Sequence, residues 1–273
     1  MRCRYREVTV ASGRYLDVKV LPVFSEEARR SVQAKRRPKF RPTSEAQARL
    51  NEFNATRHAG RLVEENFSES DVMLTPTFRD AALPATPEDF RKCVDNFIRR
   101  LRRAYEKKGA ALKYLSVIGL GEKSGRPHVH VVVNSGVLTE EELRKIWGKG
   151  RLGIDPLEFD ENGLTGLTKY MGRHRMVQKR FFHSRNLRIP QAVESDRRYS
   201  QREAAAMAQA DDRESWEKKY PGYRLIRSEP YFNPVDAKWY ITLRLWKPPA
   251  RWLKEAKADK RITQEEYRRW RTA

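Results

Sequence analysis

Two of the five histidines, His128 and His130, lie two residues apart in the apolar run PHVHVVVN (127–134). In a β-strand, successive side chains point to opposite faces, so both imidazoles share one face and Val129 and Val131 share the other. Two adjacent neutral imidazoles can bind a divalent metal ion and leave its other positions open. The alternative is a pair of strand histidines that are exposed or hydrogen-bonded. With no cysteine nearby, a closed structural zinc site is not expected.

A second group of reactive side chains lies in LTGLTKYMGRHR (164–175), which we expect to be a helix. Tyr170, Arg173 and His174 stand at i, i+3 and i+4 and therefore share one face. A metal that polarises a phosphate needs a nucleophile, and nearby cations favour the phenolate of a tyrosine, whose ordinary pKa is about 10. For a tyrosine taken in isolation, a polar helix face without chemistry is the commoner explanation.

The charge balance indicates a polyanionic partner. The chain has 57 Lys and Arg against 36 Asp and Glu, a formal net charge of +21. Nucleic acid is the expected partner, and an anionic membrane surface is the competing one. We expect no membrane contact, because no run of about 18 apolar residues occurs and no helix pairs a broad apolar face with a basic one. The first ten residues lack the apolar core of a signal peptide, so a cytoplasmic protein is expected.

The elements that must position these residues can be read from hydrophobic periodicity. Strands are expected at 71–78, 112–120 and 127–134, as a hairpin over 223–246, and as an edge strand or two within 1–25. Helices are expected at 43–66, 86–109, 139–147, 164–175 and 200–218, and beyond 251. This order predicts an α+β fold with a central antiparallel sheet, flanking helices and basic helical extensions at both ends.

Local signals support several of these boundaries. Thr86 is a good N-cap with Pro87 at the first helical position, and Gly109 is a stop signal. Thr139 and Glu142 have the spacing of a capping box. Pro76 cannot donate a ladder hydrogen bond, so it predicts an edge or a bulge in its strand.

The motifs together resemble a known superfamily. GRPHVHVVVN matches the His–hydrophobic–His motif of the HUH endonucleases, and the chain looks in particular like the replication-associated proteins of plasmids, prophages and filamentous-type phages. The resemblance covers roughly residues 40–246. Its segments, in order, are MLTPTF (73–78), LKYLSVIGLGEKSGRPHVHVVVN (112–134), GRLGIDPLEFDENGLTGLTKYMGR (150–173), KRFFHSRNLRIP (179–190) and YPGYRLIRSEPYF (220–232).

The resemblance implies a role for each matched residue. His128 and His130 would bind Mg²⁺ or Mn²⁺, and Tyr170 would attack a single-stranded DNA phosphodiester to leave a 5′-phosphotyrosine and a free 3′-hydroxyl. Arg173 stands where relatives usually have a lysine; a guanidinium can hold phosphate but is a poor proton donor.

Two positions depart from relatives. The third metal ligand is often a glutamate on the strand before the histidines; the aligned residue here is Gly119, so Glu122 in the adjacent turn takes that role or the ligand is missing. Enzymes with two tyrosines would have the second at 166, where this chain has Gly166. A one-tyrosine enzyme is therefore expected.

The segment KRFFHSRNLR (179–188) interleaves cations with aromatic rings, which suits phosphate contacts and base stacking. An equally weighted alternative is that its phenylalanines belong to the core. The residues expected to contact DNA, from this segment and from the tyrosine helix, are Lys169, His174, Lys179, Arg180, Phe181 and Arg185.

These inferences predict a nicking and joining enzyme that starts rolling-circle replication on single-stranded DNA at an origin, with a host helicase and polymerase as further partners. A relaxase or transposase would use the same chemistry, and a non-catalytic nucleic-acid-binding protein would follow if the metal site is lost. The expected divisions are a basic extension (1–68), the endonuclease core (69–193), a helix and hairpin (194–250) and a basic helix (251–273).

Overall fold

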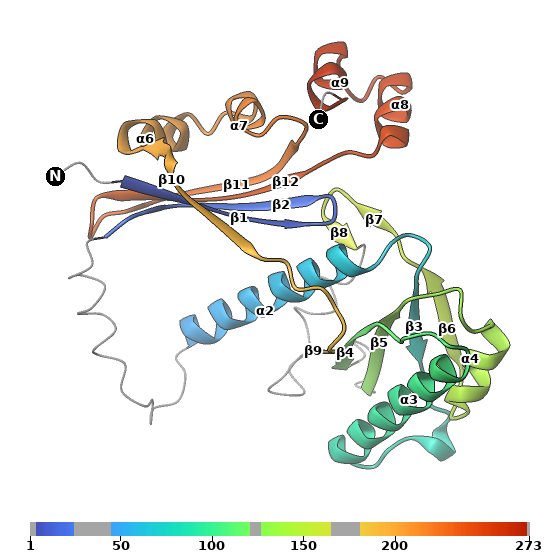
Figure 1. The fold of residues 1–273 in the computed structure, drawn as a ribbon. Coiled ribbons are helices and arrows are strands. Elements are labelled where there is room, and N and C mark those ends of the chain that lie inside the picture. The colour runs from blue at the N-terminus through green and yellow to red at the C-terminus, as the bar shows by residue number, and fades with distance from the viewer. Residues whose placement is uncertain (1–3, 25–44, 121–126, 165–180, 272–273) are drawn as a thin grey trace. The chain divides into compact units, whose positions relative to one another are not determined.

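The computed structural model describes residues 4–24, 45–120, 127–164 and 181–271 of the 273-residue chain. The chain divides into two compact units (Figure 1). Ser44–Ile189 form one, which we call the central unit. Met1–Thr43 and Pro190–Ala273 together form the other, which we call the terminal unit.

The central unit is built on a five-stranded antiparallel sheet. Its strands lie in the order β6-β3-β5-β4-β9. Their bounds are β3 (Val72–Pro76), β4 (Tyr114–Leu120), β5 (Pro127–Val133), β6 (Leu152–Pro156) and β9 (Phe181–His183). A small ladder of β7 (Phe159–Asp160) and β8 (Gly163–Leu164) follows β6. The strands predicted at 71–78, 112–120 and 127–134 are confirmed.

Two helices, α3 (Pro87–Lys107) and α4 (Glu140–Trp147), cover one face of this sheet, and a short 3₁₀ turn, η1 (Asp80–Ala82), precedes α3. Apolar side chains of both helices form one core with the valines of β5. Within this core the rings of Phe97 and Trp147 meet edge to face, with centroids 5.2 Å apart. Burial of these side chains is the main force that holds the helices on the sheet.

The predicted helix boundaries are set by local hydrogen bonds. The amide of Asp89 donates to Thr86 Oγ1 (3.1 Å), which caps α3. The amide of Glu142 donates to Thr139 Oγ1 (3.2 Å), and the amide of Thr139 donates to the Glu142 carboxylate (2.8 Å), which completes the capping box of α4. Gly109 follows α3 with a φ of +72°, a left-handed conformation that favours glycine.

Helix α2 (Glu45–Asn66) covers the opposite face of the same sheet. The side chains of this second core come from α2, β4 and β5 and include Ala59, Leu62, Val63, Leu115, Val117 and Val132. At the end of α2, Asn66 exchanges two hydrogen bonds with the backbone of Arg188 (2.7 and 2.8 Å), which ties the segment after β9 to the helix. The helix predicted over 43–66 is confirmed.

Strand β3 is an interior strand, although Pro76 predicts an edge or a bulge. Its pairing with β5 runs only from Val72 to Leu74, whereas its pairing with β6 continues to Pro76. The proline therefore lies where the ladder with β5 has already ended. Its missing N–H breaks no hydrogen bond to that neighbour.

The terminal unit contains a second five-stranded antiparallel sheet, in the order β10-β1-β2-β12-β11. The strands are β1 (Arg4–Ser12), β2 (Tyr15–Pro22), β10 (Ala192–Ser200), β11 (Arg224–Asn233) and β12 (Lys238–Trp246). The hairpin predicted over 223–246 is confirmed. The strands predicted within 1–25 form, but they are interior rather than edge strands, because β10 and β12 flank them.

Helices α6 (Gln201–Ala210) and α7 (Arg213–Lys219) pack on one face of this second sheet (Figure 1). The single helix expected over 200–218 is therefore two. Asp211 ends the first with a φ of +40°, and Asp212 caps the second by accepting a hydrogen bond from the amide of Ser215 (2.8 Å). The basic tail forms α8 (Ala250–Ala258) and α9 (Gln264–Arg271), as expected.

The α+β fold class with antiparallel sheets is thus confirmed. The segment 1–68, expected as an N-terminal extension, supplies β1 and β2 to the terminal unit and α2 to the central unit. Leu164, expected to begin a helix, lies in β8, and the rest of 164–175 falls outside the described residues. Among the described residues, no helix has the length and apolar character needed to cross a membrane.

Candidate metal centre and DNA interface

His128 and His130 lie side by side on one face of β5, as the alternation predicts. Their ring centroids are 5.1 Å apart and the rings meet edge to face. On the neighbouring strand β4, Gly119 pairs with His128 and Val117 pairs with His130. Because the residue opposite His128 is a glycine, β4 places no carboxylate beside it. The structure therefore agrees with the sequence that position 119 supplies no third ligand.

His130 is held in the neutral form that a metal requires. Its side chain is buried, with 6% of its surface exposed, and its Nδ1 lies 3.2 Å from the hydroxyl of Thr75. Burial, and secondarily the neighbouring His128, lower the pKa of His130 to about 4. At neutral pH the imidazole is uncharged, so a nitrogen lone pair is available for a metal ion.

Strands β3 and β6 extend the histidine face. Thr75 pairs with Gly153, and Met73 pairs with Asp155. The carboxylate of Asp155 lies along this face, because its Oδ2 is 3.6 Å from the point that a β-carbon on Gly153 would occupy. Asp155 is an exposed acid that the sequence analysis did not select. Only the strand order brings it to the same face as the histidines.

The donors on this face fit a divalent ion with open positions. Two neutral imidazoles supply nitrogen ligands, and no group of three or more His, Cys, Asp or Glu that could hold a metal occurs among the described residues. Imidazole nitrogen suits Mn²⁺ better than Mg²⁺, which prefers oxygen ligands. Any further ligand comes from water, from a phosphate oxygen or from residues outside the described part. Glu122, the expected third ligand, lies outside it.

Several other predicted site residues also lie outside the described part of the chain. They are Lys169, Tyr170, Arg173, His174, Lys179 and Arg180. The predicted nucleophile and its cations therefore have no described geometry, and their roles stay predictions. Of the residues expected to contact DNA, Phe181 and Arg185 are described.

Phe181 lies on the histidine face, one strand beyond β4. It pairs with Val117, the residue that also pairs with His130, so the three side chains form a row across the sheet. Phe181 is half-buried against the α2 core, and its ring stacks on His183 with centroids 6.2 Å apart. The ring is thus partly a core side chain and partly accessible. Phe182 points to the other face, where Arg91 lies 3.7 Å over its ring.

Arg185 lies in the turn that follows β9, and its side chain is exposed. The next residues are anchored, because Asn186 donates a hydrogen bond to the carbonyl of Leu112 (3.2 Å) and Arg188 is held by Asn66. Arg185 is therefore an exposed cation on an anchored turn, an arrangement suited to a phosphate contact.

His58 is a neighbour that the sequence did not reveal. It lies on α2, 6.0 Å from the ring of Phe181. Partial burial, followed by the neighbouring His183 and Arg61, lowers its pKa. The four histidines that the structure describes thus share one side of the central sheet. No spacing signal connects His58 with the rest, because the helix and β9 meet only through the fold.

A family model for the replication-associated protein ORF2 matches residues 71–175 of this chain. The matched segment is less than half of the chain. It begins just before β3 and includes β4, β5, both histidines of the pair and the predicted tyrosine. No curated protein and no solved structure matched the chain. The match confirms the resemblance to replication-associated proteins of the HUH type and indicates a role in replication.

Proposed function

We propose that the protein is a metal-dependent enzyme that nicks and rejoins single-stranded DNA to initiate rolling-circle replication. The observation that carries the proposal is the pair His128 and His130, adjacent on one strand face, with His130 neutral, inside the segment that matches the replication-associated family. A bound Mn²⁺ or Mg²⁺ would supply Lewis-acid polarisation of the scissile phosphate.

The chain's own residues carry the remaining steps. The Tyr170 hydroxyl attacks the phosphorus and loses its proton, the bond from phosphorus to the 3′ oxygen breaks, and that oxygen takes up a proton. A 5′-phosphotyrosine and a free 3′-hydroxyl result, and the reverse transfer rejoins the strand. Arg173 holds the phosphate oxygens through its guanidinium.

The exposed cations and rings next to the site orient the strand. Phe181 stacks a base, and Arg185 contacts the backbone after β9. Lys169, His174, Lys179 and Arg180 provide further phosphate contacts in this proposal. Replication at an origin in the cytoplasm would bring in a host helicase and polymerase as partners.

The test is a covalent adduct. Purified protein is incubated with Mn²⁺ and a pool of labelled single-stranded DNA, and adducts are separated on a denaturing gel. We expect an adduct with the wild-type protein and none with Tyr170→Phe or His128→Ala. His58→Ala, which removes an exposed histidine outside the pair, serves as the control and keeps the adduct. An adduct that survives in Tyr170→Phe would contradict the assignment of the nucleophile.

A second candidate function is a nucleic-acid-binding protein without catalysis. It is favoured by one observation, that no third metal-binding side chain joins the two histidines among the described residues. Such a protein would bind DNA in a salt-dependent way and form no adduct with any pool or metal. A relaxase or transposase, in contrast, would form the same adduct but on a different DNA site.

A further inference from the structure

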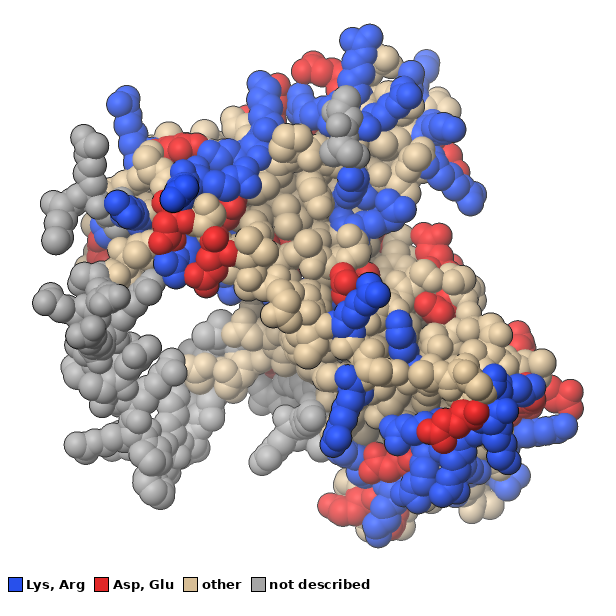
Figure 2. Space-filling model, in the orientation of Figure 1, with Lys and Arg blue, Asp and Glu red and all other residues tan. Residues whose placement is uncertain are grey.

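Helix α3 presents a row of arginines that neither the family match nor the proposed site uses. Arg99, Arg102, Arg103 and Lys107 stand at i, i+3, i+4 and i+8, which places them on one side of the helix. All four side chains are exposed. We call these four residues the α3 basic face. Figure 2 shows Lys and Arg side chains gathered where Figure 1 places α3.

The basic residues nearby are neutralised by acids, and those of the α3 basic face are not. On α3 itself, Arg91 pairs with Asp95 (3.3 Å) and Lys92 pairs with Asp89 (3.3 Å). Lys108, at the end of α3, pairs with Glu142 (3.1 Å).

The same holds on α4, the other helix on this side of the sheet. Arg144 pairs with Glu140 and Lys145 pairs with Glu141, both at 2.8 Å. In the part of the chain that the structure describes, no such ion pair or hydrogen bond engages a side chain of the α3 basic face. Glu106 lies on the same stretch of helix but forms no ion pair with the four. The positive charge of this surface is therefore concentrated and uncompensated.

The α3 basic face and the histidine pair lie on opposite sides of one sheet. The inner side of α3 packs on the side of β5 that carries Val129, Val131 and Val133. His128 and His130 alternate with these valines and point to the side covered by α2. A nucleic acid held at the histidines would therefore have the whole sheet between itself and the arginines.

We infer that the α3 basic face binds the phosphate backbone of a DNA segment other than the one cut at the histidines. From Arg99 to Lys107 the helix rises about 12 Å. A duplex carries one phosphate charge per about 1.7 Å of its axis, so this length faces roughly seven phosphates. Guanidinium groups bind phosphate oxygens in pairs and read no base. The surface is thus an anchor that is independent of sequence.

This inference goes beyond the proposed function and does not need it, because binding is measured without a divalent ion and without strand cleavage. A chain that forms no adduct can still bind DNA through α3. Conversely, a chain that nicks DNA can lack this anchor. The adduct assay and the binding assay therefore fail separately.

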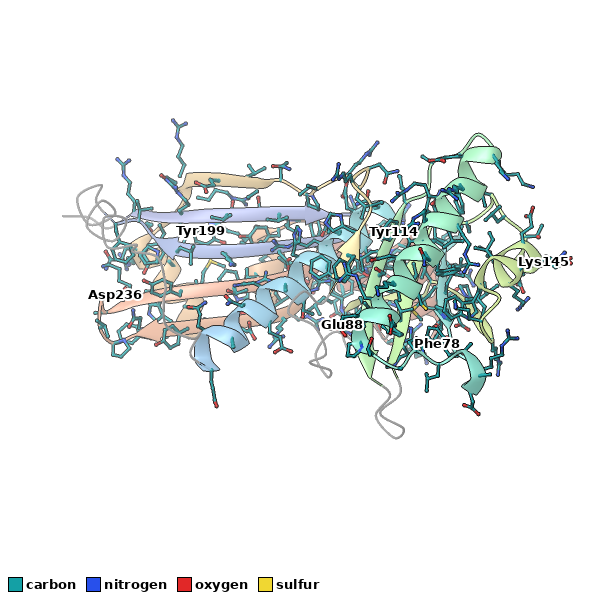
Figure 3. All side chains as sticks on the ribbon, turned by 90° about the horizontal axis from the view of Figure 1, so that it is seen from below. Phe78, Glu88, Tyr114, Lys145, Tyr199 and Asp236 are labelled. Atoms are coloured by element: carbon teal, nitrogen blue, oxygen red, sulfur yellow. The ribbon has the colours of Figure 1, made fainter. Side chains whose placement is uncertain are left out.

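The experiment compares two triple variants of the full chain. Arg99, Arg102 and Arg103 are replaced by Gln in the test variant. Lys92, Arg144 and Lys145, whose positive charges are already paired, are replaced by Gln in the control; Figure 3 shows Lys145 extending from α4 away from the sheet. Both variants lose three positive charges, so a difference between them reports position rather than net charge. Circular dichroism and a thermal melt check that both are folded.

Binding to labelled DNA is followed by fluorescence anisotropy at several salt concentrations. For a duplex, we expect the test variant to lose up to about 2.7 from the slope of log K against log salt, at about 0.9 per phosphate contact, and the control to lose less than about 1. For long single strands the expected loss is about 2. An oligonucleotide of about eight nucleotides, which one binding site covers, should bind both variants equally.

Two results would overturn the inference. Equal losses in the two variants would mean that the chain responds only to net charge. An unchanged slope in the test variant would mean that α3 does not contact DNA, and its arginines would then be candidates for an acidic protein partner.

Discussion

The two faces of β5 show how one strand serves both stability and chemistry. Val129, Val131 and Val133 are fully buried under α3 and α4. On the other face, exposure rises along the strand, from Val132 at 0% through His130 at 6% to the half-buried His128. A strand packed on both faces near one end and opening on one face at the other holds its polar side chains rigidly where solvent and ligands reach them.

The largest expected effect comes from the open end of the histidine face. His128→Ala should reduce adduct formation by at least about 100-fold, because it removes half of the nitrogen donors while the core stays intact. The thermal midpoint should change little. Adduct yield and a thermal melt are measured on the same preparation, and a large loss of stability in this variant would contradict the division between the two faces.

The next effect is on stability and concerns His130. Its pKa is lowered from about 6.5 to about 4 in the folded state, so between these values the unfolded chain takes up a proton that the folded chain does not. Stability is therefore full above about pH 6.5 and falls as pH decreases toward 4, by about 3 kcal/mol in all.

Urea unfolding in EDTA at pH 7 and pH 4.5 measures this effect. The variant His130→Gln, which does not titrate, is the comparison. We expect the difference between the two pH values to be smaller in the variant by about 2 to 3 kcal/mol. Equal pH dependence in the two proteins would show that His130 is not buried as neutral imidazole.

A smaller effect is expected on the valine face. Val131→Ala should lower the free energy of unfolding by about 2 kcal/mol, because it deletes buried methyl groups and leaves a cavity under α3. Adduct yield per folded molecule should be unchanged. If this variant instead lost activity while remaining folded, the two faces of β5 would be coupled rather than separate.

The smallest effect tests the link between β3 and β5. Thr75→Val keeps the side-chain shape but removes the hydroxyl that lies 3.2 Å from His130 Nδ1. We expect the affinity for Mn²⁺ to fall by about 10-fold, since the imidazole loses the group that orients it. Titration of Mn²⁺ in the adduct assay measures this, and Thr77→Val, one pleat further along the strand, is the control.

Predictions that depend on neighbours in sequence were the accurate ones. Both faces of β5, the cap at Thr86 and the capping box at Thr139 follow from interactions within a few residues. The break between α6 and α7 was missed, because an alanine-rich, charged stretch has the propensity of one helix. Only the left-handed backbone at Asp211 divides it.

The sequence by itself determined the strand with its two histidines, the helices that pack behind it and the basic character of α3, because periodicity of 2 or 3.6 residues sorts side chains onto faces locally. Only the tertiary structure decided which strands are neighbours. It made β1 and β2 interior strands of the terminal unit, although the other strands of that sheet are about 170 residues or more away in sequence. It also brought His58 to Phe181 and placed Asp155 on the histidine face. Such pairings depend on backbone hydrogen bonds and burial between distant segments, which no local pattern specifies.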